Sequence, residues 1–342
     1  MKPEYLMLAK TYKDQNIGGW FCSEKLDGTR AFWDGGISKG IPAKDVPYAN
    51  TIKDSRLKEQ PIATGLWSRS GKVIHAPDWW CEYLPPFFVD GELWMGYGRF
   101  QSLRSEVASQ DGDWDQVQYF AFGCPNSSFL EPRKIKIRGG EYDFEIKKNN
   151  YGLAKQIAAT PATWGFIQEL KRLEIFGEND IFKIVPQIEV PFRNQKKWVQ
   201  EKLERVIEKG GEGLVFRNKV MPWETCRSHF LLKHKPYFDC EVTIVGFTSG
   251  RETDKGSKHL GKIGALVTEL ADGKQVLVSG LTDEERELKF IDSVHAKINP
   301  GKYLPTIKES VHFKVGQTIT IKYRELSDDG IPKEASFWRK RV

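Results

Sequence analysis

The stretch Ser23-Glu24-Lys25-Leu26-Asp27-Gly28-Thr29-Arg30 decides how the chain is interpreted. It contains the pattern K-x-D-G-x-R, in which a lysine precedes a tight Asp-Gly turn and an arginine follows it. A lysine amine can attack phosphorus and hold a nucleotide through a P–N bond, so Lys25 is a candidate nucleophile. A surface Asp-Gly hairpin with a solvated lysine explains the same residues, and the rest of the chain has to decide between the two.

Composition places the chain among folded proteins of two or three domains. It has 342 residues, of which 39% are hydrophobic and 29% charged, which excludes a disordered chain. The formal net charge of +6 is compatible with a polyanionic partner, although a solvated surface gives the same count.

Cysteine usage and the N-terminus predict a reduced, intracellular setting. The five cysteines include no C-x-x-C pair, which argues against a zinc knuckle or a disulfide framework. Residues 1–10 lack the apolar region of a signal peptide, and no stretch reaches the length of a membrane span. We therefore expect a protein of the cytoplasm, or a viral protein that acts in the host cytoplasm.

The first part of the chain predicts a mixed α+β domain. Strands are expected at 19–23 and 29–33 around the lysine loop, and further on at 66–74, 87–94, 117–122, 212–217 and 230–235. Helical segments are expected at 101–109 and, with a clear apolar face, at 195–209. Residues 37–65 are expected to form an insertion or long loop, and the basic segment 131–155 either a solvated hairpin or a nucleic-acid contact.

From Asp239 onward the pattern changes to short strands separated by glycine-rich turns. Strands are expected at 240–247, 264–270, 274–279 and 318–324, with a short helix at 283–291. Short strands with one helix between them are typical of a small Greek-key barrel of the OB type.

Several short segments downstream of Lys25 combine charged, aromatic and glycine residues. In Leu231-Leu232-Lys233-His234-Lys235 the two lysines share one face, because side chains alternate along a strand. Each segment has an ordinary explanation as a turn, a core aromatic or a solvated strand, so only their combination and order favour a site. The others are Trp67-Ser68-Arg69-Ser70-Gly71, Asp90-Gly91-Glu92-Leu93, Phe120-Ala121-Phe122 and Gly211-Glu212-Gly213-Leu214-Val215.

This set resembles the covalent nucleotidyltransferases, and within them the compact ATP-dependent DNA ligases of viruses and bacteria. The segments 24–35 and 90–94 are especially similar to small accessory bacterial ligases, and 239–246, 260–266 and 323–339 resemble their C-terminal domain. The resemblance implies a nucleotidyltransferase (adenylation) domain of antiparallel sheets with flanking helices at 1–238. An OB-fold β-barrel would follow at 239–342, with a hinge near 237–239.

The resemblance also implies a reaction and its residues. Lys25 would attack the α-phosphate of ATP, release pyrophosphate and carry AMP, while Lys233 and Lys235 hold that phosphate and favour the neutral amine. Mg²⁺, with Mn²⁺ as a substitute, would be held by Glu212 and Glu92. The remaining nucleotide contacts implied are Ser23 and Glu24 at the base edge, Phe122 stacked on adenine, Arg30 and Glu92 at the ribose, and Arg324, Lys333 and Arg339 at the pyrophosphate.

The partner implied is nicked double-stranded DNA, bound by a monomer. AMP would pass to the 5′-phosphate at the nick, near Arg69, and the 3′-hydroxyl would then expel AMP. The loop 251–262 is expected either to contact the DNA backbone or to form a solvated hairpin tip. Its basic residues are Arg251, Lys255, Lys258 and Lys262.

Four other functions share parts of this pattern. An mRNA capping guanylyltransferase uses the same lysine chemistry with GTP, and an RNA ligase is less favoured because many lack the barrel. An NAD-dependent ligase is disfavoured because only 24 residues precede Lys25 and no four-cysteine zinc site is present. The last alternative is a non-catalytic nucleic-acid-binding protein with an OB domain.

Overall fold

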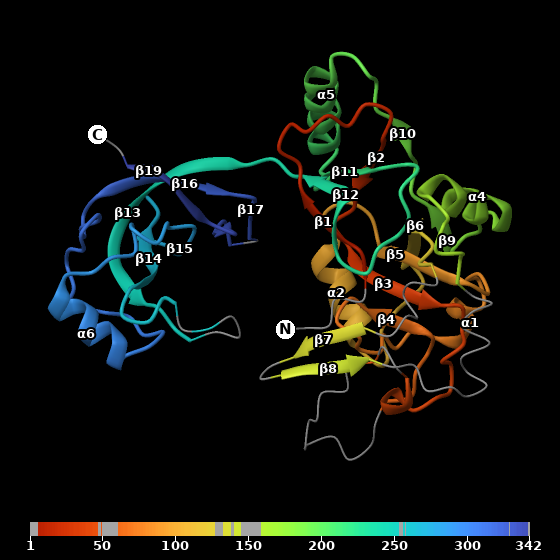
Figure 1. Cartoon of the computed structure of the whole chain (residues 1–342), viewed down its shortest axis with the longest axis horizontal. Helices are drawn as coiled ribbons and strands as arrows, with labels where there is room; N and C mark the ends of the chain where they lie inside the picture. Colours follow the sequence, from red (N-terminus) through yellow and green to blue (C-terminus); the bar gives the residue numbers. More distant parts are fainter. Residues whose placement is uncertain are drawn as a thin grey trace. The chain divides into compact units, whose positions relative to one another are not determined.

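The structure is a computed structural model that describes residues 6–46, 49, 61–126, 133–137, 140–144, 159–252, 256, 258–327 and 329–340. Contacts divide the chain into two compact units, Met1–Lys235 and Pro236–Val342, which are treated separately (Figure 1). The boundary expected from the sequence, after residue 238, falls at the first residue of strand β13 (Phe238–Ser249).

The first sheet of unit 1 carries the lysine motif. Its strand order is β1 (Leu8–Thr11), β12 (Arg227–His234), β11 (Gly213–Arg217), β2 (Phe21–Lys25) and β10 (Ile188–Glu189), with β1 parallel to β12 and the other pairs antiparallel. Helix α5 (Gln195–Glu208) lies beside β2 and β11 (Figure 1). Its Val199 and Leu203 pack on Cys22, Leu214 and Phe216, so every second residue of these strands enters the core and the residues between them face the other way.

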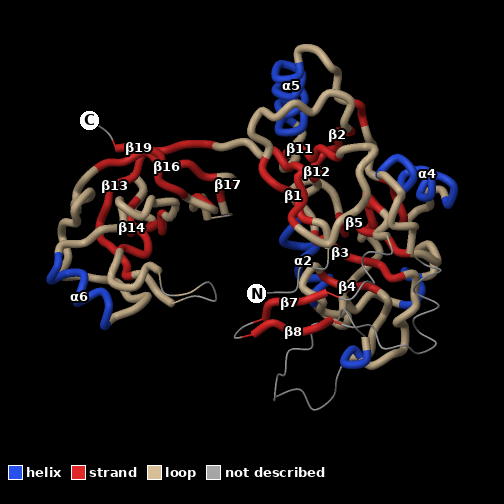
Figure 2. The backbone as a smooth tube through the Cα atoms, viewed as in Figure 1, coloured by secondary structure: helices blue, strands red, loops and turns tan. Residues whose placement is uncertain are grey.

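The second sheet of unit 1 has the order β4 (Leu66–Ser68), β3 (Thr29–Asp34), β5 (Phe88–Trp94), β6 (Gln118–Gly123) and β9 (Phe182–Ile184). All pairs are antiparallel except β6 with β9. Helices α1 (Asp78–Cys81), α2 (Phe100–Ala108) and α4 (Phe166–Phe176) supply Trp80, Leu103 and Leu173 to the core that covers one face of this sheet. In Figure 2 the strands, in red, form the centre of unit 1, and α4 and α5, in blue, lie at its periphery.

Parts of the two irregular regions are also described. Strands β7 (Arg133–Ile137) and β8 (Gly140–Phe144) pair as an antiparallel hairpin inside the basic segment 131–155. Side chains of that segment lie outside the described residues, and so do 47–48 and 50–60 of the expected insertion. The nucleic-acid alternative for 131–155 therefore stays a prediction.

Unit 2 is built on one antiparallel sheet. Its order is β15 (Gln275–Val278), β14 (Ile263–Glu269), β13, β16 (Thr318–Tyr323) and β19 (Ser336–Lys340), and β17 (Glu325–Leu326) pairs with β18 (Pro332–Lys333). Ile244, Leu266 and Ile321 belong to its core. A single bridge between Ser279 and Ser336 joins the two edge strands, so the described residues form an OB-like sheet and not the fully closed barrel expected.

The expected α+β fold is confirmed, but one helix was misplaced. Residues 283–286 form turns, and the helix of unit 2 is α6 (Phe290–Ile298). Thr282 and Glu285 bond each other's backbone N–H with their side chains, and the Arg286 guanidinium donates to the carbonyls of Ile263 and Gly264, which fixes a turn there. The short helix α1, the longer α4 and strands β1 and β19 were not anticipated. Across the described residues, no helix combines the length and apolarity needed to span a membrane.

Candidate active site

A cavity of about 810 Å³ in unit 1 gathers most of the residues that the sequence singled out. Both sheets contribute to its lining, the first through residues of β2, β11 and β12 and the second through residues of β3, β5 and β6. The predicted residues among its lining are Ser23, Glu24, Lys25, Arg30, Arg69, Glu92, Phe122 and Lys233.

The first sheet places the lysines and the serine on one face. Lys25 lies opposite Gly213 in the antiparallel register, Ser23 lies opposite Val215, and Val215 lies opposite Lys233 on the other side. Residues that oppose each other across a pair of strands share a face of the sheet. The lysine motif and the Lys-x-Lys segment, more than 200 residues apart in the sequence, therefore meet on three adjacent strands.

Glu212 connects two of the predicted catalytic lysines. Its Oε2 accepts a hydrogen bond from Lys25 Nζ, and its Oε1 pairs with Lys235 Nζ. The three side chains are between 12% and 25% exposed, so the contacts are shielded from bulk water. One carboxylate thus neutralises part of the repulsion between two ammonium groups held close together.

The tight turn after Lys25 depends on Gly28. A Cβ at this position would lie 2.2 Å from the carbonyl oxygen of Leu93 and 2.8 Å from Cγ of Glu92. The turn can therefore pack directly on β5 only because residue 28 has no side chain. This contact brings the loop that follows Lys25 against Glu92.

Glu92 is a half-buried carboxylate facing this turn. Burial raises the pKa of Glu92 to about 7, and the nearby charges of Lys25 and Arg30 oppose that rise only in part. Within the described part of the chain its carboxylate has no hydrogen-bond or ion-pair partner. A cation or a hydrogen-bond donor from a ligand would therefore stabilise the ionised form of Glu92.

Arg30 is held differently from the expectation. Its guanidinium binds Asp90 through two hydrogen bonds, from Nε at 2.9 Å and from Nη2 at 2.5 Å, and donates to the carbonyl of Met7 at 2.6 Å. Asp90 is 1% exposed and also accepts a hydrogen bond from the Trp223 indole. The guanidinium carbon lies 5.5 Å from the centre of the Phe122 ring. Sequence reasoning missed Asp90, although its place two residues before Glu92 on a strand puts both on one face.

Glu24 lies on the other side of β2 from Lys25. It opposes Leu214, which packs under α5, and its Oε2 accepts a hydrogen bond of 3.0 Å from the Tyr97 hydroxyl. Burial raises the pKa of the Glu24 carboxyl. A role at the base edge stays a prediction, and we expect it to involve the backbone of Glu24 and not its carboxylate.

Among the described residues, five arginines line the cavity, and two of them, Arg30 and Arg69, were predicted from the sequence. Arg69, which was expected to lie near a DNA phosphate, is exposed in the turn after β4 and lines the cavity. Arg104 of α2 and Arg227 of β12 also line the cavity. Phe100 and Arg104 share a helix face through their i, i+4 spacing, a signal that the sequence offered once this helix was expected.

The predicted residues of unit 2 make contacts within that unit. Arg324 donates to the carbonyl of Pro236 at 3.2 Å, and its guanidinium carbon lies 3.4 Å from the centre of the Tyr237 ring. Lys333 pairs with Glu325, and Arg339 lies over Trp338. These contacts leave the predicted pyrophosphate role untested.

The basic loop of unit 2 is partly described. Arg251 is exposed, and Lys255 lies outside the described residues. Lys258 pairs with the Asp283 carboxylate at 2.5 Å, and Lys262 Nζ lies 3.5 Å from the Asp283 carbonyl. Two of the four predicted DNA-contacting cations thus already have an acidic or carbonyl neighbour.

Comparisons with known proteins agree with this geometry. The chain is 26% identical to a solved structure from "DNA binding with a minimal scaffold: Structure-function analysis of Lig E DNA ligases", with 98% of both chains covered and a TM-score of 0.64. It is 25% identical over 338 residues to a DNA ligase of Haemophilus influenzae, covering 98% of this chain and 92% of that relative. A structure named Pmar-Lig_PreS3 has the same fold at 18% identity and a TM-score of 0.61, with 98% of this chain and 67% of that chain covered.

The family of DNA ligase OB-like domains matches residues 255–341. The fold is that of a nucleotidyltransferase domain followed by an OB-like domain. The resemblance to a compact ATP-dependent DNA ligase, expected from the sequence, is confirmed by these similarities over nearly the whole chain.

Proposed function

We infer that the protein is an ATP-dependent DNA ligase that seals nicks in duplex DNA. The observation that carries this inference is the cluster of Lys25, Glu212 and Lys235 beside a cavity of about 810 Å³, a volume within the usual range for small-ligand sites. The similarity to DNA ligases over 98% of the chain supports the same function. A capping enzyme is not favoured by any of these relatives.

The first step is proposed to be attack of Lys25 Nζ on the α-phosphorus of ATP. The P–N bond forms while the bond from that phosphorus to the bridging oxygen breaks, and pyrophosphate leaves. The amine must first lose a proton, and the Glu212 carboxylate is in contact with Nζ to accept it. Lys233 and Lys235 are proposed to hold the oxygens of the same phosphate, where they would stabilise the charge that develops.

Glu92 is the better candidate ligand for a divalent cation. Its carboxylate lacks a partner within the described residues, whereas Glu212 is already paired with Lys25 and Lys235. Among the side chains that the structure describes, no group of three or more His, Cys, Asp or Glu could bind a metal unaided. Mg²⁺ usually takes one or two carboxylates together with substrate phosphates, so this donor set fits. When bound, the ion would reduce the charge of the triphosphate.

The later steps need alignment more than acid–base chemistry. The 5′-phosphate at the nick is proposed to attack the α-phosphorus of the Lys25 adduct and release the lysine. The 3′-hydroxyl then attacks the adenylated 5′-phosphate, forming the phosphodiester and expelling AMP. Arg69, Arg104 and Arg227 are proposed to bind DNA phosphates near this cavity, because all three line it.

The test is incubation of the purified chain with ATP labelled at the α-phosphate and Mg²⁺, followed by peptide mass spectrometry. We expect an acid-labile AMP adduct on Lys25, its loss in Lys25→Ala, and its retention in the control Lys196→Ala, an exposed lysine of α5. Transfer to nicked duplex DNA should then give a sealed strand. Labelling by GTP alone would indicate a capping enzyme, and no label from either nucleotide would leave a nucleic-acid-binding protein.

A further inference from the structure

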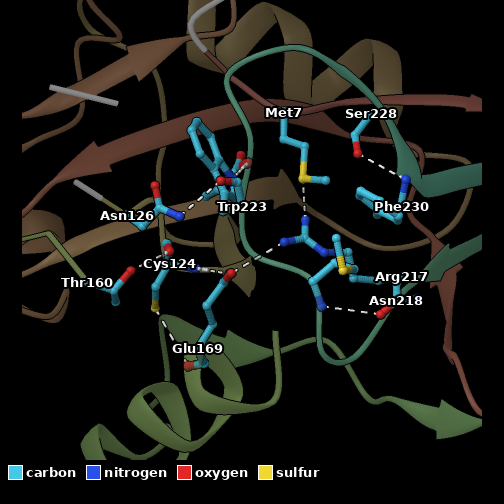
Figure 3. Close-up of polar contacts among 12 residues, drawn as sticks. Met7, Cys124, Asn126, Thr160, Glu169, Arg217, Asn218, Trp223, Ser228 and Phe230 are labelled. Atoms are coloured by element: carbon cyan, nitrogen blue, oxygen red, sulfur yellow. Dashed lines mark hydrogen bonds and ion pairs between the residues drawn. The ribbon is translucent and has the colours of Figure 1, made fainter. Parts of the chain in front are cut away.

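Glu169 of α4 is a fully buried carboxylate that the proposed mechanism does not use. Its Oε1 accepts a hydrogen bond of 3.3 Å from Arg217, and its Oε2 accepts the backbone N–H of Cys124 at 2.9 Å (Figure 3). Both oxygens therefore have a donor, as buried polar groups usually do. These contacts account for Glu169 as part of the fold and require no further role for it.

Glu24, the residue before Lys25, is a half-buried carboxylate that is less completely paired. Its Oε2 accepts a hydrogen bond from the Tyr97 hydroxyl at 3.0 Å, whereas Oε1 is buried and, in the described part of the chain, has no hydrogen-bond partner. Burial raises the pKa of this carboxyl, and the Tyr97 hydroxyl and the Lys209 charge oppose that rise. Because incomplete pairing of a shielded carboxylate is unfavourable for folding, its place beside the nucleophile indicates a role in the site.

The Tyr97 contact joins the two sheets of unit 1 next to the nucleophile. Glu24 belongs to β2 of the first sheet, and Tyr97 lies in the loop that follows β5 of the second. The Tyr97 ring packs edge-on against Trp94, the last residue of β5, with ring centroids 5.1 Å apart. Tyr97 is thus fixed on β5 through its ring and on Glu24 through its hydroxyl.

The other oxygen of Glu24 lies against the turn that leads into Glu212. A Cβ added at Gly211 would lie 2.6 Å from Glu24 Oε1, so the carboxylate packs directly on the backbone of this turn. The Gly211 N–H donates to the Val206 carbonyl at 2.8 Å, and Glu212 is the next residue. Since the Glu212 carboxylate contacts Lys25, Glu24 packs on the segment that carries this carboxylate to the nucleophile.

We propose that Glu24 is a positioning residue, whose carboxylate fixes the turn before Glu212 and thereby holds the Glu212 carboxylate at the Lys25 amine. Tyr97 holds the Glu24 carboxylate in the orientation that contacts this turn. The proposal rests on the proposed function, because it takes Glu212 as the group that accepts the proton of Lys25. The last step, in which the 3′-hydroxyl expels AMP, does not depend on this positioning.

The test measures adenylylation of Lys25 by ATP and, separately, closure of a nick that already carries AMP on its 5′-phosphate. For Glu24→Ala we expect kcat of adenylylation to fall by about tenfold to a hundredfold, as is typical when a catalytic group is displaced. KM for ATP should stay within about twofold of the wild type, because no contact with the nucleotide is lost. Closure of the pre-adenylylated nick should be retained, since it needs no proton transfer from Lys25.

Two further variants separate positioning from loss of packing. Glu24→Gln keeps the size of the side chain and an acceptor for the Tyr97 hydroxyl, so its adenylylation should be close to that of the wild type. Tyr97→Phe should lower kcat less than Glu24→Ala does, and the double variant should be no worse than Glu24→Ala alone. The matched controls, Glu208→Ala and Tyr83→Phe, replace exposed residues and should behave as the wild type.

Hydrogen exchange tests the structural part of the proposal without any activity. The Gly211 N–H should exchange about tenfold faster or more in Glu24→Ala, and at the wild-type rate in Glu24→Gln, because the turn loses its support only in the first variant. An unchanged exchange rate in Glu24→Ala would contradict the proposed contact.

Three kinetic results would also overturn the proposal. The first is adenylylation by Glu24→Ala at the wild-type kcat, and the second is a rise in KM alone, which would assign Glu24 to the nucleotide. The third is an equal loss in adenylylation and in closure, which would indicate general destabilisation. If the wild type forms no adduct with ATP, the proposed function fails, and exchange of the Gly211 N–H then tests the Glu24 contact by itself.

Discussion

At the scale of single residues, the site combines charges that do not stabilise the fold. Lys25 and Lys235 share one carboxylate, and Glu92 lies in the same group of charges without a partner among the described residues. Buried or half-buried charges that lack full pairing cost free energy of folding. Such groups are found where a ligand supplies the missing partner, which is the reason to place the nucleotide here.

Replacement of Glu92 tests whether its unpaired carboxylate lowers the stability of the folded protein. The folded-state pKa of Glu92 is raised to about 7, so the folded protein binds the proton more tightly than the unfolded chain does. The stability contributed by Glu92 is therefore greatest at low pH and is lost as the pH rises from about 4.5 through about 7. At pH 8 the unfolding free energy of Glu92→Gln should exceed that of the wild type by about 1–3 kcal/mol. At pH 4, where the Glu92 carboxyl is protonated, the difference between the two proteins should be smallest.

The measurement is urea denaturation of both proteins across this pH range, with adenylylation measured in parallel. We expect the more stable Glu92→Gln protein to be much less active. A difference in stability that does not change with pH would show that the carboxyl is ionised normally in the folded protein.

At the scale of elements, the site depends on strand alternation and one close approach. The first sheet buries Cys22, Leu214 and Phe216 against α5, and the intervening residues of β2 and β11 face the cavity. The turn between β2 and β3 then packs on β5 through Gly28. Lys25 of the first sheet and Glu92 of the second thus come together because the turn between the two sheets has no side chain at residue 28.

Gly28→Ala should move the turn between β2 and β3 away from β5. The added methyl would lie 2.2 Å from the Leu93 carbonyl oxygen, so backbone must move. We expect a loss of about 1–3 kcal/mol in unfolding free energy and a larger proportional loss of Lys25 adenylylation. Gly273→Ala is the matched control, because its added methyl in a turn of unit 2 meets nothing within 4 Å, although its φ of +83° adds strain. Adenylylation unchanged in Gly28→Ala would contradict a role for this packing in the site.

At the scale of the whole molecule, the chain divides into two compact units between Lys235 and Pro236. Unit 1 contains the cavity, and unit 2 carries an OB-like sheet of the kind that many nucleic-acid-binding proteins use. The chain has a net charge of +6, and Arg69, Arg104 and Arg227 line the cavity. These features predict that DNA binding, and not nucleotide binding alone, is governed by electrostatics.

Salt should therefore affect the two half-reactions differently. Neutralised phosphates release counterions, so nick sealing at limiting DNA should fall by about tenfold or more between about 50 and 200 mM KCl. Adenylylation of Lys25 by ATP should fall much less, because it involves no DNA. Initial rates of both reactions over this range provide the measurement. A sealing rate that does not respond to salt would count against a basic DNA-binding surface.

Some features could be read directly from the chain because they are local. The K-x-D-G-x-R pattern, the two lysines of the 231–235 segment and the apolar face of 195–209 each lie within one element, where alternation or helical periodicity fixes the outcome. The helix expected at 283–291 was wrong because side chains of Thr282, Glu285 and Arg286 fix a turn through contacts that periodicity does not encode.

The tertiary structure decided the rest, because it depends on which strands become neighbours. By itself the sequence determined the class of fold and the segments that would hold the site. Only the folded chain joined Lys25 and Lys235 through Glu212, bound Arg30 to Asp90, and anchored Arg217 on Glu169 in the same cavity. These partners lie 23 to 187 residues apart, and the chain between them carries no local signal of the pairing. Long-range pairing of strands sets these contacts, since register selects which side chains share a face.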